Sequence, residues 1–228
     1  TIGMAGLRTE RLGLHAARGV LSLFAWWFYY ASFQRLGLAL ATVLTFTSSL
    51  FVVALAGPVM GERVTLRRLA GTLVGFLGVV VVSRLGFVGF EPAVLLGLAS
   101  AFAASGIVMI TRRLAATERT PTIMFFIGVI TVLGSVPLAI LDWRPIAGSD
   151  LAMLTLMAVI GCFGMWLMIE AYRVGEVSAL APVPYLRLVF AALAGLVLFG
   201  EWPAPSIWLG SILVVAGALV VTLDRRNT

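Results

Sequence analysis

The hydrophobic residues of this 228-residue chain fall into eight long stretches separated by short connections. The stretches lie near residues 17–34, 38–58, 68–85, 92–111, 121–141, 151–172, 177–199 and 206–223. Each is long enough to cross a hydrocarbon core of about 30 Å as an α-helix. No connection is long enough to form a soluble domain. The pattern therefore predicts an all-α polytopic membrane protein with eight transmembrane helices in this chain.

The chain repeats itself at an interval of 139 residues, and no gap is needed between residues 20 and 82. Matched positions carry identical or similar residues: Val20 and Val159, Phe24 and Phe163, Trp27 and Trp166, Phe46 and Tyr185, Phe51 and Phe190, Gly61-Glu62 and Gly200-Glu201, Gly71 and Gly210, Gly78 and Gly217. Five helices separate each position from its match, so matched helices are expected to run in opposite directions. We therefore expect two inverted repeats, an architecture typical of secondary transporters.

The two expected repeats differ in length, with three helices in residues 1–85 and five in residues 86–228. The helices near 92–111 and 121–141 have no partner at the same interval. The chain also begins with Thr rather than Met. We expect the intact protein to contain two further N-terminal helices, ten in all. A genuine eight-helix protein is the alternative.

The arginines predict the orientation. With eight helices, twelve of them fall on the side where the chain begins: Arg8, Arg11, Arg18, Arg63, Arg67, Arg68, Arg112, Arg113, Arg119, Arg173, Arg225 and Arg226. Only Arg35, Arg84 and Arg144 fall on the other side. Positive residues favour the cytoplasmic side. We therefore expect a multi-pass protein of the inner membrane with both ends of this chain in the cytoplasm.

Composition narrows the function. Hydrophobic residues make up 61% of the chain and charged residues 11%, against about 25% in soluble domains. The net charge of +6 comes from arginines in short loops, so we expect no nucleic-acid partner. The chain has one cysteine, Cys162, and one histidine, His15, which excludes a disulfide framework and a histidine-based metal cluster. We expect no metal and no cofactor.

The sequence also carries no sign of catalysis. It has no His-Glu-x-x-His motif, no close acidic pair within a helix and no arrangement of Cys and His for nucleophilic chemistry. We expect no catalytic residues and interpret the chain as a transporter rather than an enzyme. A membrane-embedded enzyme and a non-transporting sensor or scaffold are the alternative functions.

Two groups of residues resemble the EamA-type family of the drug/metabolite transporter superfamily. The first is the run from Ala39 to Ser48 followed by Gly61-Glu62-Arg63, and the second is the run from Ala181 to Tyr185 followed by Phe199-Gly200-Glu201. The resemblance implies ten helices in two inverted five-helix halves that move small organic solutes by alternating access. It also implies the lipid bilayer and a small-molecule substrate as partners. A homodimer is an open alternative. The chain departs from the family pattern by lacking the first two helices.

Arg187 is the most informative candidate site residue, because it lies about ten residues into its helix and therefore near mid-bilayer. A charge there costs roughly 2.5–3.5 kcal/mol and usually faces a partner or a watered cavity. One hypothesis is a site for an anionic or carboxylate-bearing substrate. The alternative is a structural pair with Glu170 or with backbone carbonyls. Tyr185 and Glu170 are further candidates for the substrate site, and Glu170 is the candidate carboxylate for proton coupling. The matched position is Ser48, so this charge breaks the repeat.

Other candidates surround this position in sequence or by the repeat. Pro182 and Pro184 precede Tyr185 in the same helix and predict a kink, which could act as a hinge or cavity wall. Trp27 and its match Trp166 could stack on a planar substrate or anchor the protein at the membrane interface.

Hydroxyl groups concentrate in the second helix, where Thr45, Ser48 and Ser49 share a face. They could bind substrate, or they could bond a backbone carbonyl one turn away or a neighbouring helix. Glu62 and Glu201 follow helix ends. A gating role is open, and the alternative is that each carboxylate complements the dipole of the next helix.

Glycines mark the expected packing faces. Gly71, Gly75 and Gly78 lie on one side of their helix, and the second repeat has Gly210 and Gly217 at matched places. Gly97, Ala101 and Ser105 form a similar row. We expect both rows to be seams where helix backbones approach closely.

Overall fold

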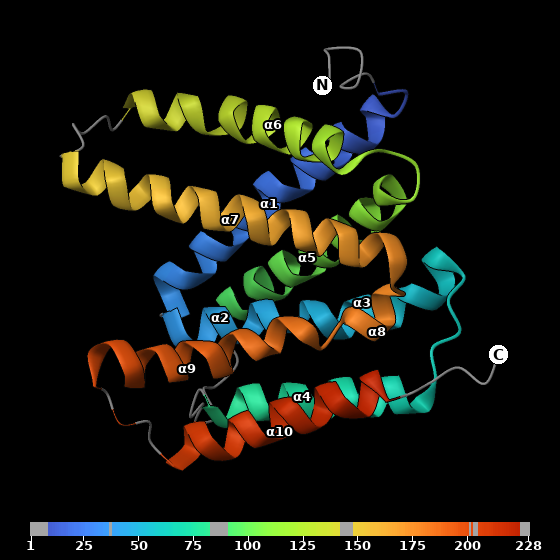
Figure 1. The fold of residues 1–228 in the computed structure, drawn as a ribbon, viewed down its shortest axis with the longest axis vertical. Coiled ribbons are helices and arrows are strands. Elements are labelled where there is room, and N and C mark those ends of the chain that lie inside the picture. Colours follow the sequence, from blue (N-terminus) through green and yellow to red (C-terminus); the bar gives the residue numbers. More distant parts are fainter. Residues whose placement is uncertain are drawn as a thin grey trace. The chain divides into compact units, whose positions relative to one another are not determined.

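A computed structural model of the protein describes residues 9–36, 38–82, 91–141, 148–200, 202 and 205–223. Within these ranges every regular element is a helix (Figure 1). The elements are α1 (Leu12–Leu36), α2 (Leu38–Phe46), α3 (Ser48–Met60), α4 (Leu66–Val82), α5 (Ala93–Ala115), α6 (Thr120–Leu141), α7 (Gly148–Val174), α8 (Val177–Leu180), η2 (Val183–Tyr185), α9 (Leu186–Phe199) and α10 (Pro205–Thr222).

Each hydrophobic stretch contains helix, but two of them are interrupted. The second stretch is divided at Thr47 into α2 and α3, and the seventh is divided into α8, η2 and α9. Five described segments are long and apolar enough to cross a membrane: Ala41–Met60, Ala93–Ala115, Thr120–Pro137, Asp150–Val174 and Val177–Ala194. An all-helical polytopic membrane protein is therefore confirmed. The count of eight crossings and their inverted order stay predictions.

The chain forms two compact units. Unit 1 comprises Thr1–Leu23 and Ile110–Gly175, and unit 2 comprises Phe24–Met109 and Glu176–Thr228. Each unit combines segments from both halves of the sequence, and α1 and α5 contribute to both units. The units are therefore groups of mutual contacts rather than repeats, and the repeat boundaries near residue 85 stay a prediction.

Unit 1 is built on the packing of α6 against α7 and the start of α1. Its core consists of Leu114, Ala115, Ile123 and Ile169, all fully buried. The guanidinium of Arg112 donates to the carbonyl oxygens of Tyr172 (2.5 Å) and Arg173 (2.7 Å) at the end of α7. The last carbonyls of a helix have no partner within it. An arginine from the α5 end therefore caps α7.

The centre of unit 2 is an antiparallel seam between α4 and α10, which lie side by side (Figure 1). A Cβ added at Gly71 would lie 2.8 Å from the carbonyl oxygen of Gly217, and one added at Gly78 would lie 2.6 Å from that of Gly210. Only glycine permits such an approach. The small-residue seam expected here is therefore confirmed. The second row also packs closely, because Ala101 and Ser105 are fully buried.

The glycine contacts in the seam follow the 139-residue repeat. Gly71 matches Gly210 and Gly78 matches Gly217, yet Gly71 meets Gly217 and Gly78 meets Gly210. Such an exchange of partners is the pattern of a contact across a two-fold axis. The interval also appears in the backbone, because α3 and α9 are followed by glycines with positive φ, 71° at Gly61 and 67° at Gly200.

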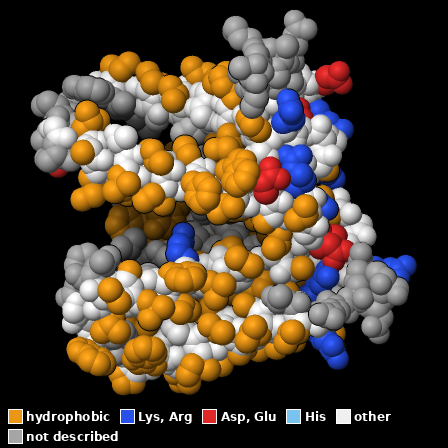
Figure 2. Space-filling model, in the orientation of Figure 1, with side chains coloured by type: hydrophobic (Ala, Val, Ile, Leu, Met, Phe, Trp, Pro, Cys, Tyr) orange, Lys and Arg blue, Asp and Glu red, His pale blue; other side chains and the backbone are white. Residues whose placement is uncertain are grey.

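The outward faces of both units are apolar. In unit 1, α7 exposes large hydrophobic side chains around most of its circumference, among them Met153, Met157, Phe163 and Leu167. In unit 2, α10 exposes Trp208, Leu209 and Ile212. Figure 2 shows hydrophobic side chains over the visible faces of both helices. Exposure of these side chains to water would be unfavourable, whereas contact with the apolar tails of lipids is not.

Candidate functional site

The first interruption lies in the hydroxyl-rich helix that the sequence singled out. α2 and α3 meet at Thr47, whose hydroxyl donates to the carbonyl oxygen of Leu44 at 2.5 Å. The hydroxyl of Thr45 donates to the carbonyl oxygen of Thr42 at 2.6 Å. Such bonds satisfy hydroxyls locally and favour a bend in the helix. For Thr45, the expected alternative of a bond to its own helix is therefore seen, whereas Ser48 is half-buried.

The second interruption lies at the two prolines. α8 ends before Pro182, the 3₁₀ turn η2 spans Val183–Tyr185, and α9 begins at Leu186. A proline has no backbone N–H and clashes with the preceding turn, so a regular helix cannot pass through Pro182 and Pro184. The position 139 residues before Leu186 is Thr47, so both interruptions fall at matched places.

The two interruptions meet inside unit 2. The rings of Phe46 and Tyr185 lie edge to face, with centroids 5.8 Å apart and an interplanar angle of 68°. The Tyr185 hydroxyl donates to the carbonyl oxygen of Phe46 at 3.4 Å, and the Tyr185 side chain is fully buried. These two residues are themselves matched by the repeat. Their contact joins the breaks in two helices that are distant in sequence.

Arg187 lies at the edge of this crossing. Its guanidinium carbon is 5.0 Å from the centroid of the Phe46 ring, and its side chain is exposed. A cation at that distance over an aromatic face gains a cation–π interaction. The aromatic face therefore holds the guanidinium.

The remaining candidates are distributed between the two units. Trp27 belongs to unit 2, is 69% exposed and stacks on Phe28. Trp166 belongs to unit 1, is 41% exposed and stacks on Phe163. The structure thus brings Tyr185 and Arg187 together around Phe46. The membership of Trp27 and Trp166 in one site with them stays a prediction.

Glu170, which the sequence offered as an alternative structural partner of Arg187, has partners within unit 1. Its carboxylate accepts hydrogen bonds from the Thr120 hydroxyl and from Nε of Arg173, the latter at 3.1 Å. Arg173 also donates to the Thr120 hydroxyl at 2.7 Å. These bonds tie the end of α7 to the start of α6 and give Glu170 a structural role of its own.

Sequence reasoning missed two features. The first is Phe46, the ring under Arg187, although its match with Tyr185 was a usable signal. The second concerns Glu62, for which the sequence favoured the dipole of the next helix. Its carboxylate instead accepts from the backbone N–H groups of Val177 (2.8 Å) and Ser178 (3.1 Å), which begin α8. Glu62 therefore does complement a helix dipole, but the helix is α8 and not the next helix in the sequence. Glu201 lies outside the described residues.

Metal chemistry finds no support in the part of the chain that the structure describes. No group of three or more His, Cys, Asp or Glu side chains there could hold a metal ion.

Comparisons with known proteins agree on one family. The profile of the EamA-like transporter family matches residues 3–84 and 91–223. The chain is 26% identical to an S-adenosylmethionine uptake transporter of Rickettsia prowazekii, over 99% of the chain and 77% of that protein. It is 29% identical to a riboflavin transporter of Rhizobium johnstonii, over 99% of the chain and 75% of that protein.

Two further proteins are similar to the chain. A pseudopaline exporter of Pseudomonas aeruginosa is 24% identical, over 98% of the chain and 80% of that protein. A solved crystal structure is 26% identical in sequence and has a TM-score of 0.81. The match covers 97% of this chain and 79% of the chain in that structure. The named relatives are all transporters, and their cargoes are different small metabolites.

Proposed function

Because the chain belongs to the EamA-like transporter family and is a membrane transporter of a small metabolite, we propose that it works by alternating access between two inverted repeats. The repeats cross the bacterial inner membrane in opposite directions, and eight crossings lie in this chain. The substrate binds where the two interrupted helices meet, beside Phe46, Tyr185 and Arg187.

Three observations support the inverted arrangement. The contacts of Gly71 and Gly78 with Gly217 and Gly210 exchange under the 139-residue interval. Glycines with positive φ follow α3 and α9 at matched places. The two interruptions are also matched and meet each other. Binding sites of inverted-repeat transporters are typically formed by such discontinuous helices.

The orientation rests on the arginine distribution, with twelve on the side of the chain's beginning and three on the other. Reporter fusions check it. Fusions after Leu85 and after Trp143 should report the periplasm, and fusions after Arg113 and at the C-terminus should report the cytoplasm. A periplasmic C-terminus would contradict both the orientation and the helix count.

The contact between Arg187 and Phe46 carries the proposal for the site. The ring holds the guanidinium in place, and a planar guanidinium can grip a carboxylate with two parallel hydrogen bonds. Tyr185 and Phe46 provide aromatic surface next to it. The geometry supports a small solute that carries a carboxylate and a planar ring. S-adenosylmethionine has both groups, so it is the first probe, and uncharged riboflavin is the comparison.

The experiment compares Arg187→Lys and Arg187→Leu in purified protein reconstituted in liposomes, with uptake of radiolabelled S-adenosylmethionine and riboflavin as the readout. Losing one charge-assisted hydrogen bond costs about 1.5–3 kcal/mol. The apparent affinity for a carboxylate-bearing substrate should therefore fall about tenfold or more in Arg187→Lys. The matched control is Arg63→Lys, at an exposed arginine of a loop.

Two results would contradict this site. One is normal uptake by Arg187→Lys at a normal protein level. The other is a loss of expression in Arg187→Leu and in Glu170→Leu that is restored when the two changes are combined, because this would reveal a structural ion pair. Absence of uptake by the unchanged protein for both probes would leave the family assignment in place and exclude these two cargoes.

A further inference from the structure

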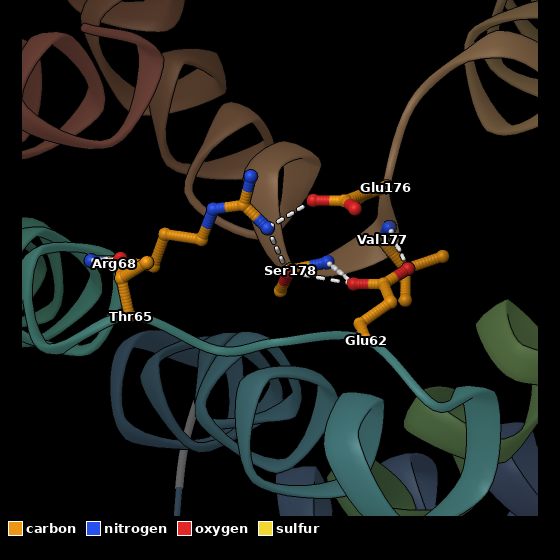
Figure 3. A network of polar contacts seen from close by, with 6 residues as sticks. All are labelled: Glu62, Thr65, Arg68, Glu176, Val177 and Ser178. Atoms are coloured by element: carbon orange, nitrogen blue, oxygen red, sulfur yellow. Dashed lines mark hydrogen bonds and ion pairs between the residues drawn. The ribbon is translucent and has the colours of Figure 1, made fainter. Parts of the chain in front are cut away.

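A polar network joins the α3–α4 connection to the start of the interrupted helix within unit 2 (Figure 3). Glu62 in that connection holds three groups of α8. Besides the N–H groups of Val177 and Ser178, its carboxylate accepts from the Ser178 hydroxyl at 2.6 Å. A carboxylate at a helix N-terminus satisfies free N–H groups and complements the helix dipole.

Arg68 completes the network from α4. Its guanidinium pairs with the carboxylate of Glu176 and donates to the Ser178 hydroxyl at 2.8 Å. Ser178 therefore accepts from Arg68 and donates to Glu62, so both bonds share one hydroxyl. The Arg68 side chain is 6% exposed and that of Glu176 is 21% exposed. The Arg68 side chain is thus largely shielded from water, whereas the Glu176 side chain is partly accessible to it.

α8 depends on this network for its position. The helix has only four residues, and its own turn is closed by bonds from Ala179 and Leu180 to the carbonyl oxygen of Glu176. So short a helix is not stable by itself. It continues directly into the segment that ends in Tyr185. Any movement of α8 away from Glu62 and Arg68 would therefore be transmitted to the candidate site.

The network joins the two repeats but has no counterpart at the positions matched by the 139-residue interval. The positions 139 residues from Arg68, Glu176 and Ser178 are Ile207, Gly37 and Ala39, and none of these side chains can form an ion pair or donate from a hydroxyl. Only Glu62 has an equivalent, Glu201. In an inverted arrangement, matched positions lie on opposite membrane faces. The ion pair can therefore act on one face alone, the face of the arginine-rich loops.

We propose that Glu62, Arg68, Glu176 and Ser178 form a latch that closes the arginine-rich side of the transporter and opens once in each transport cycle. This proposal rests on the proposed alternating access. In the closed state the latch fixes α8 and thereby positions Tyr185 and Arg187. Because the matched positions on the opposite face carry side chains that cannot form this ion pair, the two gates are unequal, and the resting protein favours closure on the arginine-rich side.

Cross-linking tests whether the contact must open. Cys162 is first replaced by Ser, and Glu62→Cys and Ser178→Cys are combined so that a short bis-methanethiosulfonate reagent can bridge them. Bridging should lower uptake at least tenfold, and reduction with dithiothreitol should restore it. Each single-cysteine variant with the same reagent is the control. Full uptake by the bridged protein, or failure of the two cysteines to bridge, would overturn the latch.

A second measurement compares amide exchange in the unchanged protein and in two variants. Hydrogen–deuterium exchange of the amides of residues 177–180 should accelerate about tenfold when saturating substrate drives the protein through its cycle. The Arg68→Gln/Glu176→Gln variant should show fast exchange without substrate, while Arg67→Gln, an exposed arginine on the same helix, should match the unchanged protein. Slow exchange under all these conditions would overturn the latch.

The two proposals fail differently. If the unchanged protein transports substrate and the bridged protein does so equally well, the latch is wrong and the transport mechanism stands. If amide exchange at residues 177–180 responds to no transported solute and access to the site never alternates between the two faces, the alternating-access proposal itself is wrong.

Discussion

The seam between α4 and α10 and the crossing of the interrupted helices follow the same repeat, but the seam is symmetric under it and the crossing is not. In the seam, both halves contribute glycines and the contacts exchange as the interval requires, so the two sides are equivalent. In the crossing, Phe46 and Tyr185 keep the aromatic character, but Arg187 matches Ser48. The symmetric region leaves no space for a ligand, whereas the asymmetric region presents an exposed cation.

The difference shows where the duplicated sequence was free to diverge. A residue in the seam faces backbone atoms, which cannot move aside, so glycine is required on both sides. A residue at the crossing faces side chains and an exposed edge, so a change from a hydroxyl to a guanidinium can be accommodated. Packing therefore preserves the repeat, and recognition of an asymmetric solute requires that it be broken.

The largest effect is expected in the seam. A Cβ at Gly217 would lie 2.5 Å from the carbonyl oxygen of Gly71 and 2.6 Å from the backbone nitrogen of Gly75. Gly217→Leu should therefore cost more than the about 1–3 kcal/mol typical of overpacking and abolish most folded protein. Size-exclusion chromatography and thermal unfolding in detergent measure this loss.

The matched control for that change is Gly128→Leu in α6, where no atom of the described residues outside its own stretch of helix lies within 4 Å of an added Cβ. This variant should keep the yield and thermal midpoint of the unchanged protein. A Gly217→Leu protein as stable as Gly128→Leu would show that the two backbones do not approach closely in the membrane.

A smaller effect is expected at the crossing. Phe46→Leu keeps an apolar side chain but removes the ring under Arg187, and a cation–π interaction contributes about 0.5–2 kcal/mol. The apparent affinity for substrate should fall by about two- to thirtyfold while the protein stays folded. Phe46→Tyr keeps the ring and should transport almost normally. Equal affinities for the Leu and Tyr variants would mean that the ring does not position Arg187.

The smallest effect is expected at Thr45, whose hydroxyl already bonds the carbonyl oxygen of Thr42. Thr45→Val keeps the shape and loses one hydrogen bond, which contributes about 0.5–1.5 kcal/mol to stability. The thermal midpoint should fall by a few degrees at most, with no change in the apparent affinity for substrate. A large loss of affinity at unchanged stability would place this hydroxyl in the binding site.

The sequence determined the class of fold because the energetic cost of burying backbone in lipid leaves few solutions. Long apolar stretches must be helices, and glycines at spacings of three and four residues indicate close packing. The helices in all eight stretches and the α4–α10 seam could therefore be predicted from the sequence. The interruption at Pro182 and Pro184 was also expected, because proline cannot continue a helix. The break at Thr47 was not, since hydroxyls fit equally well in a continuous helix.

Arg187 was found from the sequence because a lone charge in an apolar stretch is costly wherever the helix is placed. Its partner ring was not found, and neither were the helix that Glu62 caps and the ion pair of Arg68 with Glu176. These contacts join residues more than a hundred positions apart, and many aromatic or acidic side chains were chemically suitable. The sequence thus determined which residues required a partner. Only the tertiary structure decided which partner each one has, because that choice depends on where the helices cross.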